Sequence, residues 1–482
     1  MTGAIGLPVL EADLARQLAL IGHGGADWTR PRTHPDGHVH DVVIVGGGQS
    51  GMAAAFGLLR ERVSNIVVID DSPAGLEGPW ATYARMLTLR TPKHLNPIDF
   101  GIPALSYRAY WEAQHGAAGW DGVDKIARDD WMAYLRWYRR VLALPVRNDA
   151  RLTLIEPLGD DLHRLHLDGQ EPVLARKVVL ATGIQGGGEW HVPPMIADAL
   201  PPALYAHTSA AIDYAALAGK RIAILGGGAS AFDNANAALM AGVAEAHVFL
   251  RRKTLPRINP IRFMEQVGFT GRYPALGDAD KYAVMASFLA HNQPPTNDTF
   301  DRASARPGFA LHLDAPWLSV APEGAGARVA TPQGTHDFDF LVLSTGLVSD
   351  PGLRPELRLL ADKVARWADR FTPPAGGANA LIDAHPYLGP GFELLPRAPG
   401  DAPALHGLFA FNYSALVSLG LSAAALSGLQ AALPRLVRGV TDQLFLDDRH
   451  ALVADLLAYD EAEFVGEWPR PVSAAPRSAA AA

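Results

Sequence analysis

The stretch Val42-Val43-Ile44-Val45-Gly46-Gly47-Gly48-Gln49-Ser50-Gly51 decides the fold of this chain. Its apolar half predicts a buried strand of a parallel sheet, because such strands are covered on both faces. In the Gly46-x-Gly48-x-x-Gly51 spacing, the first glycine permits a tight turn, the second leaves room for a pyrophosphate, and the third lets helix and strand pack closely. An Ala-rich helix follows to about Arg62, and the amides at its start, around Gln49 and Ser50, would face the diphosphate. The stretch therefore predicts a dinucleotide-binding βαβ unit.

The next apolar run, Ile66–Ile69, supplies the second strand of this unit and ends in two acids. Asp70 lies nineteen residues after Gly51, where a carboxylate accepts hydrogen bonds from a ribose, and Asp71 is the fallback. Glycines also mark ordinary turns, so a lone glycine motif could be a plain βαβ connection. The strand before it, the helix after it and the acid at the right distance favour an FAD site.

A second copy of the unit begins at Ile222–Leu225 and continues into a helix over Ala229–Ala241 and a strand over Ala246–Leu250. The residues expected to face the second diphosphate are Gly226, Gly228, Ala229, Ser230 and Ala231. Here the second strand ends in Arg251-Arg252-Lys253 rather than in an acid. A guanidinium suits the 2′-phosphate of NADPH, whereas a carboxylate would suit NADH. A solvated basic turn is the alternative; its place in the unit favours NADPH, bound by Arg251 and Arg252.

These patterns predict an α/β fold with two Rossmann-like dinucleotide-binding domains, in which the NADPH domain is inserted into a discontinuous FAD domain. A helical insertion is expected at about residues 256–316, and the small-residue run Leu408–Leu433 predicts a helix packed inside a domain and stopped by Pro434, rather than a membrane span. The expected division is an N-terminal extension over 1–40, the first part of the FAD domain over 41–190, the NADPH domain over 191–335, the second part of the FAD domain over 336–467, and a disordered tail over 468–482.

Composition narrows the chemistry. The 482 residues include no cysteine, which excludes disulfides, thiolate metal sites and a redox-active cysteine pair, so a bound flavin must do the redox chemistry itself. The formal net charge of −8 gives no general attraction to nucleic acid or to anionic membranes. Met1–Leu10 lacks the pattern of a secretory signal, so we expect a cytoplasmic protein. The sequence leaves the oligomeric state open, a homo-oligomer included.

Three shorter motifs extend the pattern. Ala181-Thr182-Gly183 and Ser344-Thr345-Gly346 end two further apolar runs, and Gly78-Pro79-Trp80 follows the first βαβ unit. Together with the glycine turns, over most of residues 41–440, they resemble the class B-type FAD- and NADPH-dependent flavoprotein monooxygenases, which hold the flavin-containing monooxygenases, the Baeyer–Villiger enzymes and the N-hydroxylases. The resemblance implies that Trp80, Thr182, Gly183, Thr345 and Gly346 lie at the cofactors.

Two stretches match single branches of that group in part. Leu204–Ser209 is similar to the end of the FxGxxxH signature of flavin-containing monooxygenases, with His207 in the histidine position but Ala203 and Pro201 in place of glycine and phenylalanine. His207 is either a cofactor-binding residue with a role in cofactor alternation or a satisfied linker histidine. Thr88–Pro92 is similar to the TLRDP stretch of ornithine and lysine N-hydroxylases, yet Ala84 stands where their pattern has a substrate-contacting lysine. The resemblance therefore leaves the substrate unassigned.

The resemblance also implies a reaction. NADPH reduces the flavin, the reduced flavin captures dioxygen as a C4a-(hydro)peroxide, and one oxygen passes to a nitrogen, sulfur or carbonyl of a small organic substrate. Arg85 and Lys93 follow Trp80 and would supply positive charge in the pocket, and Asn412 would supply an amide donor or acceptor. The alternative is that these residues anchor a long loop.

Two other functions stay open at this point. The chain could be an NADPH oxidase or flavin reductase that oxygenates no substrate, or a nucleotide-binding protein without catalysis. The complete pair of cofactor turns favours the monooxygenase.

Overall fold

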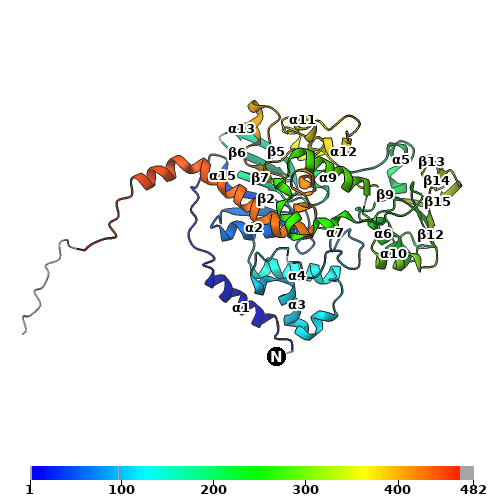
Figure 1. The fold of residues 1–482 in the computed structure, drawn as a ribbon, viewed down its shortest axis with the longest axis horizontal. Coiled ribbons are helices and arrows are strands. Elements are labelled where there is room, and N and C mark those ends of the chain that lie inside the picture. The colour runs from blue at the N-terminus through cyan, green and yellow to red at the C-terminus, as the bar shows by residue number, and fades with distance from the viewer. Residues whose placement is uncertain (1–2, 96, 160, 292, 467–482) are drawn as a thin grey trace, which may run out of the picture.

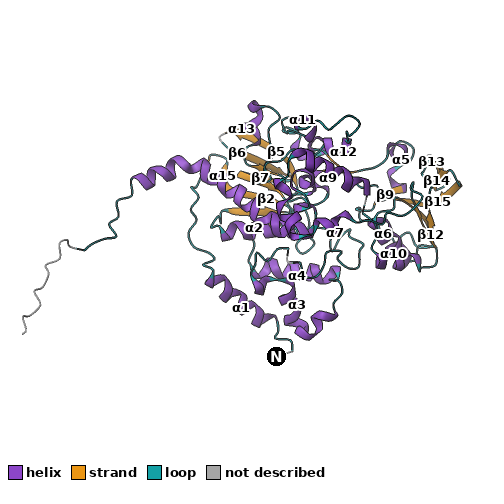
Figure 2. Ribbon diagram, viewed as in Figure 1, coloured by secondary structure: helices purple, strands orange, loops and turns teal. Residues whose placement is uncertain are grey.

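The computed structural model describes residues 3–95, 97–159, 161–291 and 293–466. Its strands form two main groups (Figures 1 and 2). One lies near the middle of the molecule, and the other lies on the side opposite the C-terminal helix. This confirms the predicted α/β fold with two sheets rich in parallel strands. The predicted tail over 468–482 lies outside the described residues.

The first sheet has the strand order β4-β3-β2-β7-β6-β5, with β1 paired to β2 and β18 paired to β7. Strands β2, β3, β4, β7 and β18 run parallel, whereas β5 and β6 return antiparallel. The bounds are β1 Thr33–His34, β2 Gly37–Val45, β3 Ile66–Ile69, β4 Val146–Arg147, β5 Leu152–Gly159, β6 Leu162–Leu167, β7 Gln170–Leu180 and β18 Leu408–Phe409.

The second sheet is parallel throughout, in the order β12-β11-β10-β16-β9. Alternate residues of its central strand enter cores on opposite faces: Ile222 and Ile224 pack in one, Ala223 in the other. Burial on both faces explains why these strands are continuous apolar runs. The bounds are β9 Tyr205–His207, β10 Arg221–Leu225, β11 Glu245–Phe249, β12 Phe309–His312 and β16 Phe340–Leu343. A separate antiparallel sheet comprises β13 Ser319–Glu323, β14 Gly326–Thr331 and β15 Gly334–Phe338.

Two predicted boundaries are wrong. The insertion is helical only to Ser304, because β12 continues the second sheet beside β11 within the expected helical stretch. Strand β16 pairs with β10 and β9, so the chain returns to the first domain after this strand and not at residue 336. Both strands are short, and their place in the sheet depends on pairing with residues distant in sequence. The chain passes between the domains at two short strands, which pair antiparallel with each other: β8 Gly188–Trp190 and β17 Leu347–Ser349.

The predicted helix over Leu408–Leu433 is also wrong. This segment holds β18, the short α14 (Leu416–Leu419) and only the start of α15 (Leu429–Leu457), which continues through Pro434. Packing on α2 (Gln49–Arg60) holds α15 together there, and Gly57 of α2 allows the close approach, since a Cβ at Gly57 would lie 2.5 Å from Val437. The last turns of α15 project from the body (Figure 1).

The remaining helices cover the sheets or form the insertion. Their bounds are α1 Leu7–Leu20, α3 Tyr107–His115, α4 Arg128–Val141, α5 Pro194–Ala197, α6 Ala229–Met240, α7 Pro260–Met264, α8 Val267–Arg272, α9 Asp278–His291, α10 Asn297–Ser304, α11 Trp367–Arg370, α12 Ala380–Asp383 and α13 Ala402–Leu405. Within the described ranges, every helix is too short or too polar to cross a bilayer.

Candidate active site

The first glycine turn lies between the ends of β2, β3 and β7. Gly46 has a φ of 109°, and a Cβ there would lie 2.4 Å from the carbonyl oxygen of Ala181. A Cβ at Gly51 would lie 1.8 Å from the Gly46 oxygen, so α2 packs directly on the turn. Among the described residues, a Cβ at Gly48 would meet nothing nearer than the Gly78 Cα, at 3.7 Å. The fold itself needs the first and third glycines, whereas Gly48 and Gly78 border a lane without side chains at the start of α2, which fits a diphosphate.

Asp70 lies at the end of β3 beside this turn. Its side chain is nearly buried; Oδ2 accepts a hydrogen bond from the Gly47 amide at 2.6 Å, and Oδ1 accepts one from the Ser72 amide at 2.8 Å. Burial raises the pKa of Asp70, and these amides oppose that rise. The fallback, Asp71, is 52% exposed and pairs with Arg151 at 3.3 Å. Of the two acids, Asp70 is therefore the one placed for a ribose.

Gln49, the first residue of α2, is held by two indoles. Its Oε1 accepts hydrogen bonds from Trp80 Nε1 at 3.2 Å and from Trp131 Nε1 at 3.1 Å, and Trp131 is buried. With the amide oxygen taken, the NH2 of Gln49 is the end that can donate to a phosphate. Trp80 thus reaches the first cofactor turn through Gln49.

Glu77 is a buried residue of this region that the sequence analysis missed. Its carboxylate pairs with Arg139 and accepts hydrogen bonds from Asn148 Nδ2 at 2.7 Å and from the Gly75 amide at 2.9 Å. A Cβ at Gly47 would lie 3.2 Å from the Cγ of Glu77, so the Glu77 side chain packs directly against the glycine turn. A carboxylate seven residues after Asp70, next to Gly78-Pro79-Trp80, was the available signal.

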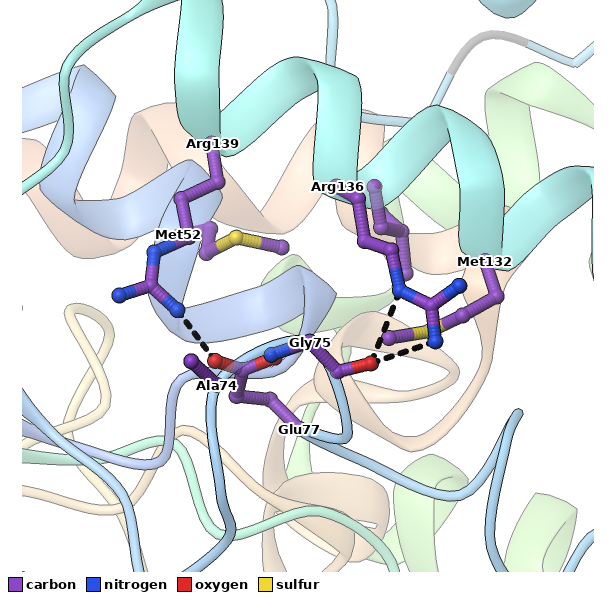
Figure 3. A pocket seen from close by; sticks show the side chains of 8 residues that line it. Met52, Ala74, Gly75, Glu77, Met132, Arg136 and Arg139 are labelled. Atoms are coloured by element: carbon purple, nitrogen blue, oxygen red, sulfur yellow. Dashed lines mark hydrogen bonds and ion pairs between the residues drawn. The ribbon is translucent and has the colours of Figure 1, made fainter. Parts of the chain in front are cut away.

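A cavity of about 230 Å³ opens beside Glu77, between α2, α4 and the loop after β3. Figure 3 shows Arg136 and Arg139 reaching down from α4, with Arg136 bonded to the Gly75 carbonyl and Arg139 to Glu77. Met52 and Met132 line the space between them. The arginines are thus occupied in holding the loop that carries Glu77, next to the turn.

The second glycine turn repeats the geometry of the first. Gly226 has a φ of 117°, and a Cβ there would lie 2.3 Å from the Ser344 carbonyl oxygen, as Gly46 does against Ala181. Ala231, in place of the third glycine, is fully buried. A Cβ at Gly228 would come no nearer than 3.8 Å to another described atom, the Gln293 oxygen. Ala229 and Ser230 begin α6, whose amides point into this opening.

The two arginines of the basic turn after β11 have different surroundings. Arg252 is directed at α9, where its Nη2 donates to the Ala290 carbonyl at 2.9 Å. Its guanidinium thus caps a helix C-terminus, which favours Arg251 over Arg252 as the ligand of the 2′-phosphate, and the prediction for both residues stays a prediction. Arg251 is exposed, and no hydrogen bond or ion pair of its guanidinium occurs within the described ranges.

Asn412 binds the strand end that was expected to lie at the flavin. Its Nδ2 donates to Thr182 Oγ1 at 3.1 Å and to the Gly186 carbonyl at 3.3 Å, and its Oδ1 accepts from the Ser414 amide at 3.0 Å. Both ends of the amide are used by the protein, and the predicted role as an amide donor or acceptor for flavin or substrate stays a prediction. Asn412 instead positions Thr182 and the adjacent Gly183, which has a φ of 75°.

The corresponding strand end of the second domain is held by His191, which follows β8 in the hinge, the pair of strands β8 and β17 that connects the domains. Thr345 Oγ1 donates to the His191 carbonyl, and the His191 amide donates to the Gly346 carbonyl at 3.0 Å. His207 stacks on Trp190, with ring centroids 4.6 Å apart, and burial lowers the pKa of His207 to about 4. A neutral, packed His207 favours the linker interpretation over a direct cofactor contact.

The two predicted catalytic cations are both engaged by the protein. Arg85 donates to the carbonyls of Thr82 and Ile212, each at 3.0 Å, and its guanidinium lies 5.7 Å from the centre of the Tyr214 ring. Lys93 Nζ donates to the Trp120 carbonyl at 2.7 Å and lies over the same indole. These contacts favour the alternative, in which the two residues anchor the loop, and a role for their positive charge in the pocket stays a prediction.

The site as a whole lies at the carboxyl ends of the parallel strands of both sheets, where α/β folds bind dinucleotides. Each sheet offers one glycine turn, one helix start without obstructing side chains, and one small-residue strand end packed on the turn. An acid stands beside the first turn and an exposed arginine beside the second. The residues present therefore fit FAD in the first domain and a nicotinamide dinucleotide in the second.

Comparison with known proteins gives the family. A family model described as FAD-NAD(P)-binding matches residues 43–185, and one described as L-lysine 6-monooxygenase/L-ornithine 5-monooxygenase matches residues 122–274. In fold, the chain is similar to the ornithine hydroxylase of Pseudomonas aeruginosa, with a TM-score of 0.65 at 18% identity over 84% of this chain and 100% of that one. It is also similar to the ornithine N-hydroxylase of Kutzneria sp. 744, with a TM-score of 0.63 at 19% identity over 84% of this chain and 99% of that one.

One relative is much closer in sequence. The FAD-dependent urate hydroxylase of Xanthomonas campestris pv. campestris is 65% identical over 469 residues, which cover 97% of this chain and 99% of the relative. This identity spans both glycine turns, the hinge and α15, and it confirms the resemblance that the motifs indicated. The chain belongs to the family of FAD- and NAD(P)H-dependent flavoprotein monooxygenases that includes this urate hydroxylase.

Proposed function

We propose that this monooxygenase hydroxylates urate. The observation that carries the proposal is the 65% identity, over nearly the whole of both chains, to a protein named for that activity. The ornithine-specific relatives share under 20% identity with this chain and support the fold alone. In addition, Ala84, which stands in place of their substrate-contacting lysine, is buried and offers no charge to an amino acid.

The reaction balances with two cofactors and dioxygen. Bound FAD would accept a hydride from the reduced nicotinamide and deliver one oxygen atom of dioxygen to urate, while the other oxygen leaves as water. The protein's part is to hold the dinucleotides at the two glycine turns, with Asp70 toward the ribose of FAD and Gln49 toward its diphosphate. Trp80, Thr182 and Gly183 would border the flavin, and Thr345 and Gly346 the nicotinamide.

For the reductant, we propose NADPH, with Arg251 as the ligand of the 2′-phosphate. Arg251 follows β11, where the acid that would bind a free ribose is missing, and its guanidinium is exposed. The reaction draws on reduced nicotinamide, so we place the protein in the cytoplasm, where that reductant is regenerated.

The test is a stoichiometry. The purified FAD-loaded protein is given NADPH, dioxygen and urate, and we expect equal molar losses of all three, with little hydrogen peroxide. Ornithine, lysine, a sulfide and a ketone are supplied in parallel as other candidate substrates. A Gly48→Asp variant, which places a carboxylate in the diphosphate lane, serves as the control and should lose FAD and all three consumptions.

Two results would overturn the proposal. NADPH oxidation with stoichiometric peroxide and unchanged urate would indicate an oxidase. Coupled oxygenation of ornithine or lysine, with urate untouched, would indicate an N-hydroxylase.

A further inference from the structure

Charged side chains of the first domain reach into the second beside the cofactor turns. Arg90, in the loop after Trp80, forms an ion pair with Asp233 of α6. Lys125 Nζ lies 2.5 Å from Asp298 Oδ1 of α10. We call these two contacts, with that of Arg85 to the Ile212 carbonyl, the interdomain seam.

The Arg90–Asp233 pair is the most buried part of the seam. The side chain of Arg90 is 20% exposed and that of Asp233 is 8% exposed. Burial raises the pKa of Asp233, and the charge of Arg90 opposes that rise. The Arg90 carbonyl is itself held by Arg262 Nη2 of α7 at 2.8 Å, so the loop is fixed at this residue from two elements. Because Arg90 is the main counter-charge of the buried Asp233, we expect the pair to hold the loop and α6 in one relative position.

The positions of the two residues give the pair its significance. Asp233 lies one turn into α6, whose first amides would face the nicotinamide dinucleotide. The loop that carries Arg90 begins at Gly78, which borders the FAD lane opposite Gly48. The pair thus connects the element that holds one cofactor to the loop that borders the other.

We infer that Arg90 and Asp233 are positioning residues that set the distance and angle between the reduced nicotinamide and the flavin. In that step a hydride leaves the nicotinamide, which is oxidised, and enters the flavin, which is reduced. Neither side chain touches the reacting atoms. The inference rests on the two-cofactor assignment and is independent of the organic substrate. A misplacement of about 1 Å can slow such a step about 100-fold. Small rotations of α6 would therefore lower the rate of flavin reduction.

The experiment is anaerobic stopped-flow reduction of the FAD-loaded protein by NADPH, without urate. For Arg90→Gln and Asp233→Asn, we expect the limiting rate constant of flavin reduction to fall at least about tenfold. FAD content and the Kd for NADP⁺ should change little, whereas the thermal midpoint should fall because the buried partner loses its counter-charge. Arg90→Lys should recover most of the rate and of the stability. Glu245→Gln is the matched control. It breaks an exposed ion pair with Arg221 at the opposite end of the second sheet, and its flavin should be reduced at the normal rate.

Asp233→Glu adds one methylene while keeping the charge, and it tests the geometry if the neutral variants fold poorly. We expect it to fold normally and to be reduced slowly. Normal limiting rates in Arg90→Gln and Asp233→Glu would overturn the inference. So would rates that fall only in proportion to lost FAD or lost stability. A failure of urate turnover with normal flavin reduction would overturn the proposed substrate and leave this inference intact.

Discussion

Arg251 and Arg252 are adjacent in sequence, yet their contacts predict opposite results on substitution. Arg251→Ala should raise the KM for NADPH about tenfold, because a charge-assisted bond to a phosphate is worth about 1.5–3 kcal/mol and exposure lowers that value. The KM for NADH should not change, since NADH lacks the 2′-phosphate. Arg252→Ala should leave the NADPH-to-NADH ratio unchanged and lower the thermal midpoint, because its guanidinium caps α9. Initial rates with both cofactors measure the difference.

Lys253→Ala is the control for general charge at this turn, because Lys253 is exposed beside the two arginines. Equal use of NADPH and NADH by the wild type would show that no 2′-phosphate site exists here. A loss of NADPH preference in Arg252→Ala alone would show that the cap is not its role.

At the scale of elements, α15 is held to the first sheet by buried charge. Lys177 of β7, fully buried, donates to Asp447 Oδ2 at 2.6 Å, and the neighbouring Arg176 pairs with Asp448 at 2.9 Å. Asp447→Asn leaves the Lys177 ammonium buried without its counter-charge, so the free energy of unfolding should fall by about 3–5 kcal/mol in urea titrations. Asp442→Asn, which removes an exposed pair with Arg438 on the same helix, should change it by about 0.5 kcal/mol or less.

The same pair predicts a pH dependence. Burial raises the pKa of Asp447, but His406 and Lys177 outweigh it and lower that pKa to about 2, against an ordinary value of 3.8. A folded-state pKa below the unfolded one stabilises the fold above about pH 4, and this stabilisation is lost as the pH falls toward 2. Asp447→Asn should therefore show a shallower acid loss of stability than the wild type. Parallel acid profiles for both proteins would contradict this assignment.

At the scale of the whole molecule, the two dinucleotide sheets have separate cores. The domains are joined by the pair β8–β17, by the interdomain seam and by an apolar cluster that packs the insertion helices against α11, α12 and α14. We expect two calorimetric transitions in the cofactor-free protein, since each domain buries its own apolar sheet faces. FAD at about 100 times its Kd should add about 2.7 kcal/mol to the stability of the first domain alone, and NADP⁺ should shift only the other transition. A single transition moved by either ligand would show that the domains unfold as one unit.

Sequence reasoning worked where the physical cause is local. The positive φ of Gly46 and Gly226, the helix starts at Gly48 and Gly228, and Asp70 at a strand end follow from residue types within one short segment. Spacing alone therefore located both cofactor turns.

Side-chain partners could not be predicted in this way, because they depend on segments that meet only after folding. Arg85, Lys93 and Asn412 have the residue types of an active site, and only the folded structure shows that each also donates to a distant backbone carbonyl. Glu77 was overlooked because its burial depends on Arg139 and Asn148.

The sequence by itself determined the parallel α/β fold, the two dinucleotide turns and, through the absence of cysteine, a flavin-centred chemistry. Only the tertiary structure decided that β12 and β16 belong to the second sheet, that Arg252 faces α9, and that Arg90 meets Asp233 across the domains. The physical reason is the separation in sequence of the residues that interact. Turn geometry is set by the backbone preferences of a few consecutive residues, whereas strand order and ion pairing are set by which surfaces exclude water together once the chain has collapsed.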